Sequence, residues 1–298
     1  MKRGRMGPPR TLAGIFLFFT LALQAHPQEV RLQDALDRTL SFKEPPRRIV
    51  SLNPAVTEVL FAIGAGDRLV GVTEFCNYPP EALKITKVGG FSGATVSVEQ
   101  IAVLVPDLVL ASAEMHERIV RLLEAVNIRV FTVEPRTIEE VYAVIDRLGH
   151  ICGQPEGAGE VISGMKEKIR LAQERRRGRE TPSVFWEVWD EPLMSAGGST
   201  FISEALSLGG GRNIFSDMKE HWPQVSLEQV ILRRPDWIMT VSDRMGAASP
   251  ENLAKRTGWS SLPALRNGRI AVIESDTIYR WGPRLADAVL EIAHILHP

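Results

Sequence analysis

The sequence contains few cysteines, and this scarcity limits what kind of protein it encodes. Of its 298 residues, only Cys76 and Cys152 are cysteines. Two cysteines do not make a disulfide framework, and their spacing is not a metal-binding signature. The sequence leaves open whether the two pair with each other or remain free thiols.

An excess of charge of one sign is also missing. The formal net charge is −1, whereas a nucleic-acid-binding surface usually requires a basic excess. The sequence therefore predicts no nucleic-acid partner. One local basic run, at residues 175–179, is interpreted as the solvated end of a helix.

Motifs of enzymes are absent as well. The sequence has no nucleophile elbow, no zinc-binding His-Glu-x-x-His helix and no P-loop lysine motif. The glycines at 209–211 follow an expected helix instead of a strand, so they are interpreted as a helix stop. Six histidines show no metal-ligand spacing. We therefore predict a protein that is not an enzyme, holds no metal and needs no cofactor, with an extracytoplasmic enzyme as a remote alternative.

Only one long hydrophobic run occurs, and it lies at the N-terminus. Basic residues such as Lys2 and Arg3 precede an apolar stretch from Leu12 to Leu23, which predicts a signal peptide at residues 1–25 with a cut after Ala25. The stretch is short for a membrane anchor, which is the alternative interpretation. No cysteine lies at the cut, so no lipid anchor is expected there. The mature protein is predicted to be soluble and periplasmic.

Strand and helix patterns alternate along the rest of the chain, which indicates parallel βαβ units and an α/β fold. A short hairpin is expected first, at residues 30–45. The expected strands are 48–52, 68–73, 107–111, 129–133, 183–188, 237–241 and 268–273. The expected helices are 55–63, 97–105, 114–126, 137–149, 201–208, 226–232 and 283–296.

One segment breaks this alternation. Residues 156–177 keep a helical period of apolar positions over about 20 residues with no strand attached. We interpret it as one long helix that joins two lobes. The predicted organisation is therefore an N-terminal lobe at 26–150, a linking helix at 155–178 and a C-terminal lobe at 182–298.

A repeat supports the two lobes. Residues 96–107 and 225–236 share Val, Ser, Glu, Gln, Pro and Asp at matching positions. The period is far too long for a solenoid, whose repeats are about 20–50 residues long. Two similar lobes form a cleft between them, and a cleft is where a small molecule binds.

Large side chains in expected loops are the candidates for ligand binding. Most follow strand ends or precede helices, where open α/β sheets bind their ligands. Flat aromatic faces with a neighbouring arginine suit a large, partly planar ligand with polar edges; the alternative is that these side chains pack the lobes' own cores. Trp186, within a strand pattern, is interpreted as core. The candidates are Phe75, Tyr78, Phe91, Met194, Trp222, Tyr279, Arg280 and Trp281.

Glu99 and Glu228 occupy the same position in the two repeats. As carboxylates in the first turn of a helix they have a structural interpretation, because the helix dipole favours them there. Alternatively, two like charges on two related lobes mark a docking face for a symmetric basic partner.

At these residues the sequence resembles the periplasmic substrate-binding proteins of ABC importers for cobalamin, siderophores and haem, and it is most similar to the vitamin B12-binding proteins. The resemblance covers about residues 46–298. The segments that carry it are 48–58, 71–80, 106–111, 222–230 and 282–285.

The resemblance implies a class III periplasmic-binding-protein-like fold with little hinge motion, and a corrinoid held between the lobes. Phe75, Phe91, Trp222 and Arg280 match ligand-contacting positions, whereas Ser112 and Met194 replace aromatics. It also implies that Glu99 and Glu228 each meet arginines on one subunit of a dimeric membrane permease.

A siderophore or haem is the alternative cargo. Arg280 and Arg284 form the only close basic pair in these loops that an anionic siderophore would use. Tyr78, Tyr279 or His221 would serve as an axial ligand to haem.

Overall fold

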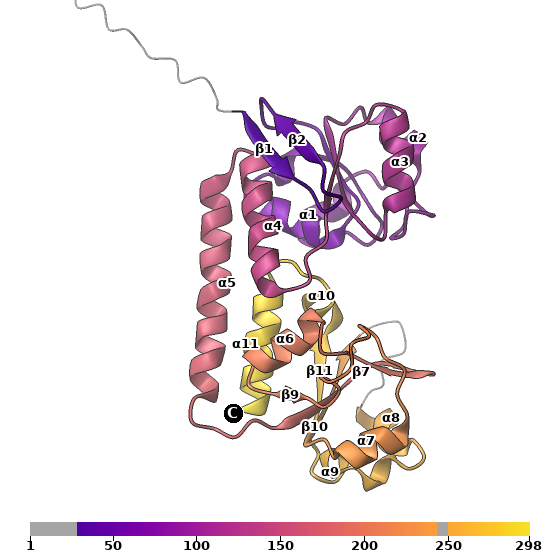
Figure 1. Cartoon of the computed structure of the whole chain (residues 1–298), viewed down its shortest axis with the longest axis vertical. Helices are drawn as coiled ribbons and strands as arrows, with labels where there is room; N and C mark the ends of the chain where they lie inside the picture. Colours follow the sequence, from indigo (N-terminus) through magenta and orange to yellow (C-terminus); the bar gives the residue numbers. More distant parts are fainter. Residues whose placement is uncertain (1–28, 243–249) are drawn as a thin grey trace, which may run out of the picture.

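The computed structural model describes residues 29–242 and 250–298. Two α/β lobes lie one above the other, and a long helix, α5 (Pro155–Arg176), runs beside both (Figure 1). The two lobes and the joining helix confirm the predicted fold class. The predicted signal peptide at 1–25 lies outside the described residues. Within the described ranges, no helix is long and apolar enough to cross a membrane.

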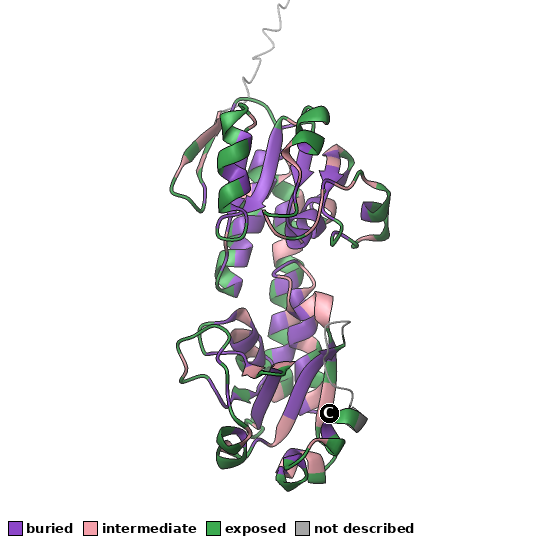
Figure 2. Ribbon diagram, turned by 90° about the vertical axis from the view of Figure 1, so that its right-hand side faces the viewer, coloured by how far each residue is buried: buried purple, intermediate pink, exposed green. Residues whose placement is uncertain are grey.

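The first lobe is built on a parallel sheet of four strands in the order β4-β3-β5-β6. Every residue of β3, β5 and β6 is buried, as expected for parallel strands covered on both faces. In Figure 2 the buried strands lie at the centre of each lobe and the outer helices expose one side. The strands are β3 (Ile49–Ser51), β4 (Leu69–Val72), β5 (Leu108–Ser112) and β6 (Val130–Val133), and the helices are α1 (Pro54–Ala62), α2 (Val98–Val103), α3 (Glu117–Ala125) and α4 (Ile138–Ile151).

The second lobe repeats this plan around β7, which pairs in parallel with β10 and β9 and antiparallel with β8. Strand β10 also pairs in parallel with β11. Trp186 on β7 is fully buried, which confirms its place in the core. The strands are β7 (Ser183–Asp190), β8 (Leu193–Ser195), β9 (Arg212–Asn213), β10 (Trp237–Ser242) and β11 (Ile270–Glu274), and the helices are α6 (Phe201–Leu208), α7 (Leu227–Arg233), α8 (Pro250–Lys255), α9 (Pro263–Arg266), α10 (Ser275–Ile278) and α11 (Leu285–Leu296).

Helix α5 is a continuous rod of 22 residues, about 33 Å long at the usual rise per residue. It packs against α4 of the first lobe and α11 of the second, as Figure 1 shows. Because both lobes contact the same rod, their relative position is more restricted than flexible strand linkers would allow.

Two details differ from the sequence-based expectations. The segment after Val188 was expected to be a loop, but β7 continues to Asp190 and turns into β8. The arginines at the end of α5 are not simply solvated. Arg175 Nε donates to the His297 carbonyl at 2.9 Å, and Arg179 Nη1 donates to the Pro298 carbonyl at 2.8 Å. These arginines attach the end of the chain to the linking helix.

The two cysteines are both buried and both free. Burial raises the pKa of the Cys152 thiol to about 12, so this thiol is protonated at neutral pH and weakly reactive. The structure thus answers the question that the sequence left open: the two sulfurs do not form a disulfide.

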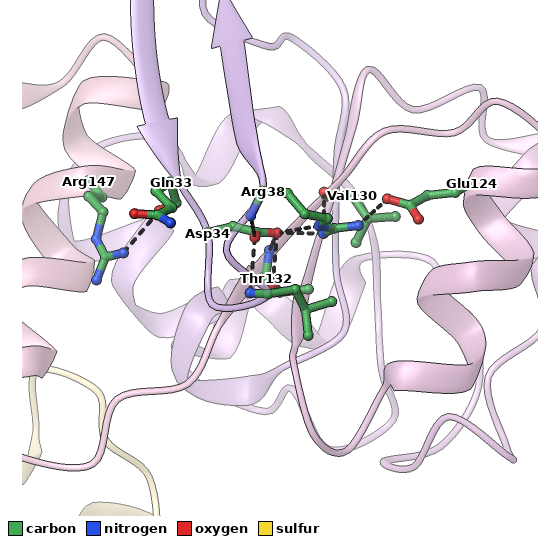
Figure 3. A network of polar contacts seen from close by, with 8 residues as sticks. Gln33, Asp34, Arg38, Glu124, Val130, Thr132 and Arg147 are labelled. Atoms are coloured by element: carbon green, nitrogen blue, oxygen red, sulfur yellow. Dashed lines mark hydrogen bonds and ion pairs between the residues drawn. The ribbon is translucent and has the colours of Figure 1, made fainter.

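The expected lead-in hairpin is present as β1 (Val30–Gln33) and β2 (Thr39–Phe42). Its turn is fixed to the first lobe by Asp34, which is 4% exposed. The Asp34 carboxylate accepts hydrogen bonds from Thr132 Oγ1 at 2.8 Å and from Arg38 Nε at 3.0 Å (Figure 3). Burial alone would raise the pKa of Asp34, but the hydrogen bonds from Arg38 and Thr132 outweigh it and lower the pKa.

We predict that Asp34→Ala lowers the free energy of unfolding by about 2–3 kcal/mol, because it leaves Arg38 and Thr132 without their buried partner. Since the folded-state pKa of Asp34 is lowered, the wild-type protein should lose this stabilisation as the pH falls below about 4, and the variant should show less of that loss. Urea unfolding between pH 3 and 7 measures both effects. Glu44→Ala is the control, because Glu44 is exposed and its contact with Arg47 is 4.0 Å long. Equal stability of the two variants would contradict the anchoring role of Asp34.

Candidate functional site: a cleft between the lobes

A cleft of about 620 Å³ lies between the two lobes, within the size range of small-molecule sites. The first lobe contributes segments that follow β3, β4, β5 and β6, and the second contributes the start of α6 and the segment from α10 to Trp281. These segments follow the carboxyl ends of parallel strands or begin helices, which is where α/β sheets bind ligands.

Exposed aromatic side chains form the apolar surface of the cleft. Phe75 and Phe91, on two loops of the first lobe, make an edge contact with ring centroids 5.7 Å apart. Trp222 lines the cleft from the second lobe. Phe75, Phe91 and Trp222 are 51%, 39% and 42% exposed, which is unusual for large aromatics and leaves their faces available for a ligand.

His116 holds the loop of Phe91 in place. Its imidazole is fully buried, with Nδ1 accepting from the Ser112 N–H at 3.0 Å and Nε2 lying 3.0 Å from the Phe91 carbonyl. Burial lowers the pKa of His116, so the ring is neutral, and the Ser112 contact places the proton on Nε2. The histidine therefore ties the end of β5 to the Phe91 loop, a role that its sequence spacing did not indicate.

Six of the eight predicted ligand-binding residues line the cleft, and two do not. Tyr78 lies outside the lining, and the guanidinium of Arg284 covers its ring at 3.8 Å from the centroid. Met194 lies in β8, where it forms an isolated bridge with Gln224. Ser112 also lines the cleft. The lining residues among the eight are Phe75, Phe91, Trp222, Tyr279, Arg280 and Trp281.

The sequence analysis missed several residues of the lining, most of them polar. They lack aromatic rings and recognisable motifs, and the available signal was their position directly after a parallel strand. Glu114 and Met115 follow β5, the segment 134–136 follows β6, and Asp276 follows β11. Asn53 follows β3, where its side chain caps α1 and donates to Ser112 Oγ at 2.8 Å.

Arg280 bridges the two lobes at one end of the lining. It contacts Asp276 of its own lobe at 2.7 Å, and it donates to Asn77 Oδ1 of the first lobe at 2.6 Å. Asn77 in turn donates to Asp276 at 2.8 Å. The arginine is thus engaged by a carboxylate and fixed across the lobe junction.

A second arginine makes a similar bridge from the first lobe. Arg136 forms an ion pair with Glu114 and donates to His221 Nε2 of the second lobe at 3.4 Å. Nearby, burial raises the pKa of Glu134, and the charge of Glu114 adds to that effect. In the described lining both arginines therefore already contact a carboxylate.

A buried ion pair lies at the junction of the lobes. Glu58 on α1 is 3% exposed in its side chain; it accepts from Arg284 Nε at 2.9 Å and from the Arg284 backbone N–H at 3.0 Å. Burial raises the pKa of Glu58, although Arg284 opposes the shift. Gly282 makes this approach possible, since a Cβ there would lie 2.9 Å from Glu58 Oε1.

The second lobe makes the reciprocal contact. Glu204 on α6 accepts from the backbone N–H of Ile138, the first residue of α4, at 2.8 Å. Each lobe thus uses a glutamate on its first major helix to satisfy a backbone N–H at the start of the other lobe's last helix. Burial raises the pKa of Glu204 as well.

Glu99 and Glu228 lie outside the cleft, exposed in the first turns of α2 and α7. The Glu99 backbone N–H and the Ser97 hydroxyl lower the pKa of Glu99, and the Ser226 hydroxyl with the Glu228 backbone N–H lowers that of Glu228. Both carboxylates are therefore ionised at neutral pH. In Figure 1, α2 and α7 both lie away from α5, one on each lobe.

Comparison with known proteins identifies the class. Residues 49–277 match the family model described as periplasmic binding protein, and the chain belongs to this family. One relative is an uncharacterized ABC transporter substrate-binding lipoprotein, YvrC, of Bacillus subtilis. It is 34% identical over 277 residues, which cover 90% of this chain and 86% of that protein.

Two solved structures are similar to this chain. The periplasmic vitamin B12 binding protein BtuF of Vibrio cholerae is 29% identical with a TM-score of 0.72, covering 85% of this chain and 97% of that chain. The periplasmic heme-binding protein RhuT from Roseiflexus is 26% identical with a TM-score of 0.73, covering 84% and 98%. The chain has the fold of this family. The names of these two relatives state different ligands, vitamin B12 for one and heme for the other.

We predict that Arg284→Met lowers the free energy of unfolding by about 3 kcal/mol, because Glu58 would remain buried without its partner. The double variant Glu58→Gln/Arg284→Met should recover part of that loss, since it removes the stranded charge. Chemical denaturation of the single and double variants measures the coupling. Arg269→Met, at an exposed arginine, should change stability by less than about 0.5 kcal/mol. Strict additivity of the two changes would show that Glu58 and Arg284 are not coupled.

Proposed function

We propose that this protein captures cobalamin or a related corrinoid between its lobes and delivers it to the permease of an ABC importer, without changing the ligand covalently. The observation that carries this proposal is the cleft lined by exposed aromatics from both lobes. Such a surface suits a bulky ligand with a flat, apolar body. The similarity to vitamin B12-binding proteins supports the same ligand class.

The charges of the cleft favour a ligand without several carboxylates. Arg136 contacts Glu114 and Arg280 contacts Asp276, so an anionic ligand would have to displace a carboxylate from each arginine. A corrinoid edged by neutral amides needs no free cation. Its amides would instead meet polar groups already present in the lining, such as Asn53, Ser112 and Thr200.

Haem is the second candidate, because Tyr279 and His221 both line the cleft and either side chain is chemically suited to iron. Tyr78, the third residue considered for that role, lies under Arg284. Arg284 is itself paired with Glu58 at the junction, which weakens the case for an anionic siderophore. His221 Nε2 also lies 3.4 Å from Arg136, so that nitrogen is engaged.

Delivery follows from the outer surface of the lobes. Glu99 and Glu228 are exposed and ionised on related helices, which suits a partner with two equivalent basic sites such as a permease dimer. This function also requires export, for which the predicted signal peptide at 1–25 provides the route to the periplasm. The proposed action is binding alone, so no enzymatic step and no cofactor enter it.

The first test is a titration of the mature protein with cyanocobalamin, haemin and a ferric siderophore by calorimetry. We expect sub-micromolar binding of cyanocobalamin. Trp222→Ala should weaken that binding by about 1–3 kcal/mol, as loss of an aromatic anchor does elsewhere. Leu83→Ala is the control, because this exposed side chain lies outside the lining, and its effect should be small. Tight binding of haemin alone would overturn the corrinoid assignment.

The second test concerns delivery. Glu99→Ala/Glu228→Ala should strongly reduce cyanocobalamin uptake into proteoliposomes containing the cognate importer, while the affinity for cyanocobalamin stays at the wild-type value. Glu160→Ala/Glu180→Ala removes two other exposed carboxylates and should leave uptake unchanged. A loss of ligand affinity in the first pair that matched the loss of uptake would contradict a docking role.

A further inference from the structure

The structure separates the residues of the repeat into those that the fold uses and those that it does not. Ser97 and Ser226 cap α2 and α7 by accepting from the N–H of Gln100 and Gln229. These four residues therefore have a local structural role in starting the two helices.

The repeated Pro-Asp pairs also serve the fold. Asp107 accepts from the Arg48 N–H at 2.9 Å, and Asp236 accepts from the Ser183 N–H at 2.8 Å. Each aspartate thereby ties the exit of its helix to the beginning of the central strand of its lobe. Before each pair the backbone turns through a left-handed residue, with φ of 44° at Val105 and 47° at Arg234.

Among the remaining equivalent positions, two pairs stand out because they are exposed on both lobes and have matching chemistry. One is Glu99 and Glu228. The other is Val103 and Leu232, which are 82% and 81% exposed and lie four residues after the respective glutamate. Neither Val103 nor Leu232 is among the hydrophobic residues that pack against the described core, whereas Leu104 and Leu227 are.

Helical geometry places each glutamate and its apolar neighbour together. Residues four apart in a helix share one face, so Glu99 lies beside Val103 on α2, and Glu228 lies beside Leu232 on α7. Each lobe therefore presents the same pair: an ionised carboxylate and, one turn later, a protruding aliphatic side chain. Neither aliphatic side chain belongs to a hydrophobic cluster of the described residues.

We propose that Val103 and Leu232 are the apolar contacts of a two-point docking surface, which comprises Glu99, Val103, Glu228 and Leu232. The partner that fits it has two equivalent halves, each offering a basic side chain and, about one helical turn away, an apolar depression. This inference rests on the proposed delivery to a dimeric permease, and it assigns the two aliphatic residues a part in it.

The two kinds of contact contribute differently to such an interface. Ion pairs that stay near solvent add little net affinity but guide encounter and orientation. Burial of a valine or leucine side chain is not screened by salt and contributes more to the lifetime of the complex. The glutamates are therefore expected to govern the salt dependence and the association rate, and Val103 and Leu232 the dissociation rate.

The test measures binding of the ligand-loaded mature protein to its cognate importer in nanodiscs. Val103→Ser and Leu232→Ser should each weaken binding roughly tenfold, mainly through faster dissociation, and the double variant more than either. The salt dependence should remain as in the wild type. Cyanocobalamin affinity should also be unchanged, because neither residue lines the cleft.

The control is Leu36→Ser/Leu171→Ser, which changes two other exposed leucines, 37% and 41% exposed, and should leave importer binding intact. Wild-type binding by Val103→Ser/Leu232→Ser would overturn the proposal while leaving the glutamate contacts standing. An effect at only one of the two positions would overturn its two-fold form. Failure of the wild-type protein itself to bind the importer would overturn the delivery function and this inference together, whereas importer binding without cyanocobalamin binding would overturn the ligand assignment alone.

Discussion

The cleft depends on the buried contact between Glu58 and Arg284 at the junction of the lobes. Glu58 lies on the first helix of one lobe, and Arg284 directly precedes the last helix of the other. A buried carboxylate without its partner is costly, so separation of the lobes here would be opposed strongly. Together with the continuous α5, this contact restricts the cleft to a narrow range of widths. Under the proposed function, recognition would therefore depend more on a preformed surface than on closure around the ligand.

The surface of the cleft is unusual in two respects, the exposure of its aromatic side chains and the pairing of its arginines. Its aromatics are exposed although large apolar side chains are normally buried, and its arginines are neutralised although a cleft of this kind could hold anions. Phe91 keeps its position because buried His116 holds its carbonyl, and Arg280 keeps its position because Asn77 and Asp276 hold its guanidinium. These polar contacts therefore hold the aromatic faces in position, and their carboxylates neutralise the positive charge of the arginines in the cleft.

Much of the fold could be predicted because the determining signals are local. Asn53 followed by Pro54 marks the start of α1, the glycines after Leu208 end α6, and the period of residues 156–177 identifies α5. The site was predicted in part, since aromatics after strand ends are visible in the sequence. The exclusion of Tyr78 depends on Arg284, 206 residues later along the chain (284 − 78 = 206), and the role of His116 depends on a loop 25 residues earlier. Such contacts are set by tertiary packing, which no local pattern encodes.

Each lobe contributes a glutamate that contacts the other lobe, and this reciprocal contact affects what happens when the chain is cut into two fragments. Glu58 reaches the last helix of the second lobe and Glu204 reaches the last helix of the first, which is the arrangement that two identical subunits make across a two-fold axis. A fragment ending within α5 would keep Glu58 without Arg284, and the Ile138 N–H at the start of α4 without its acceptor Glu204. Fragments cut at this rod should therefore recombine with each other in preference to folding as separate monomers, and a circular permutant opened there would keep both contacts within one molecule.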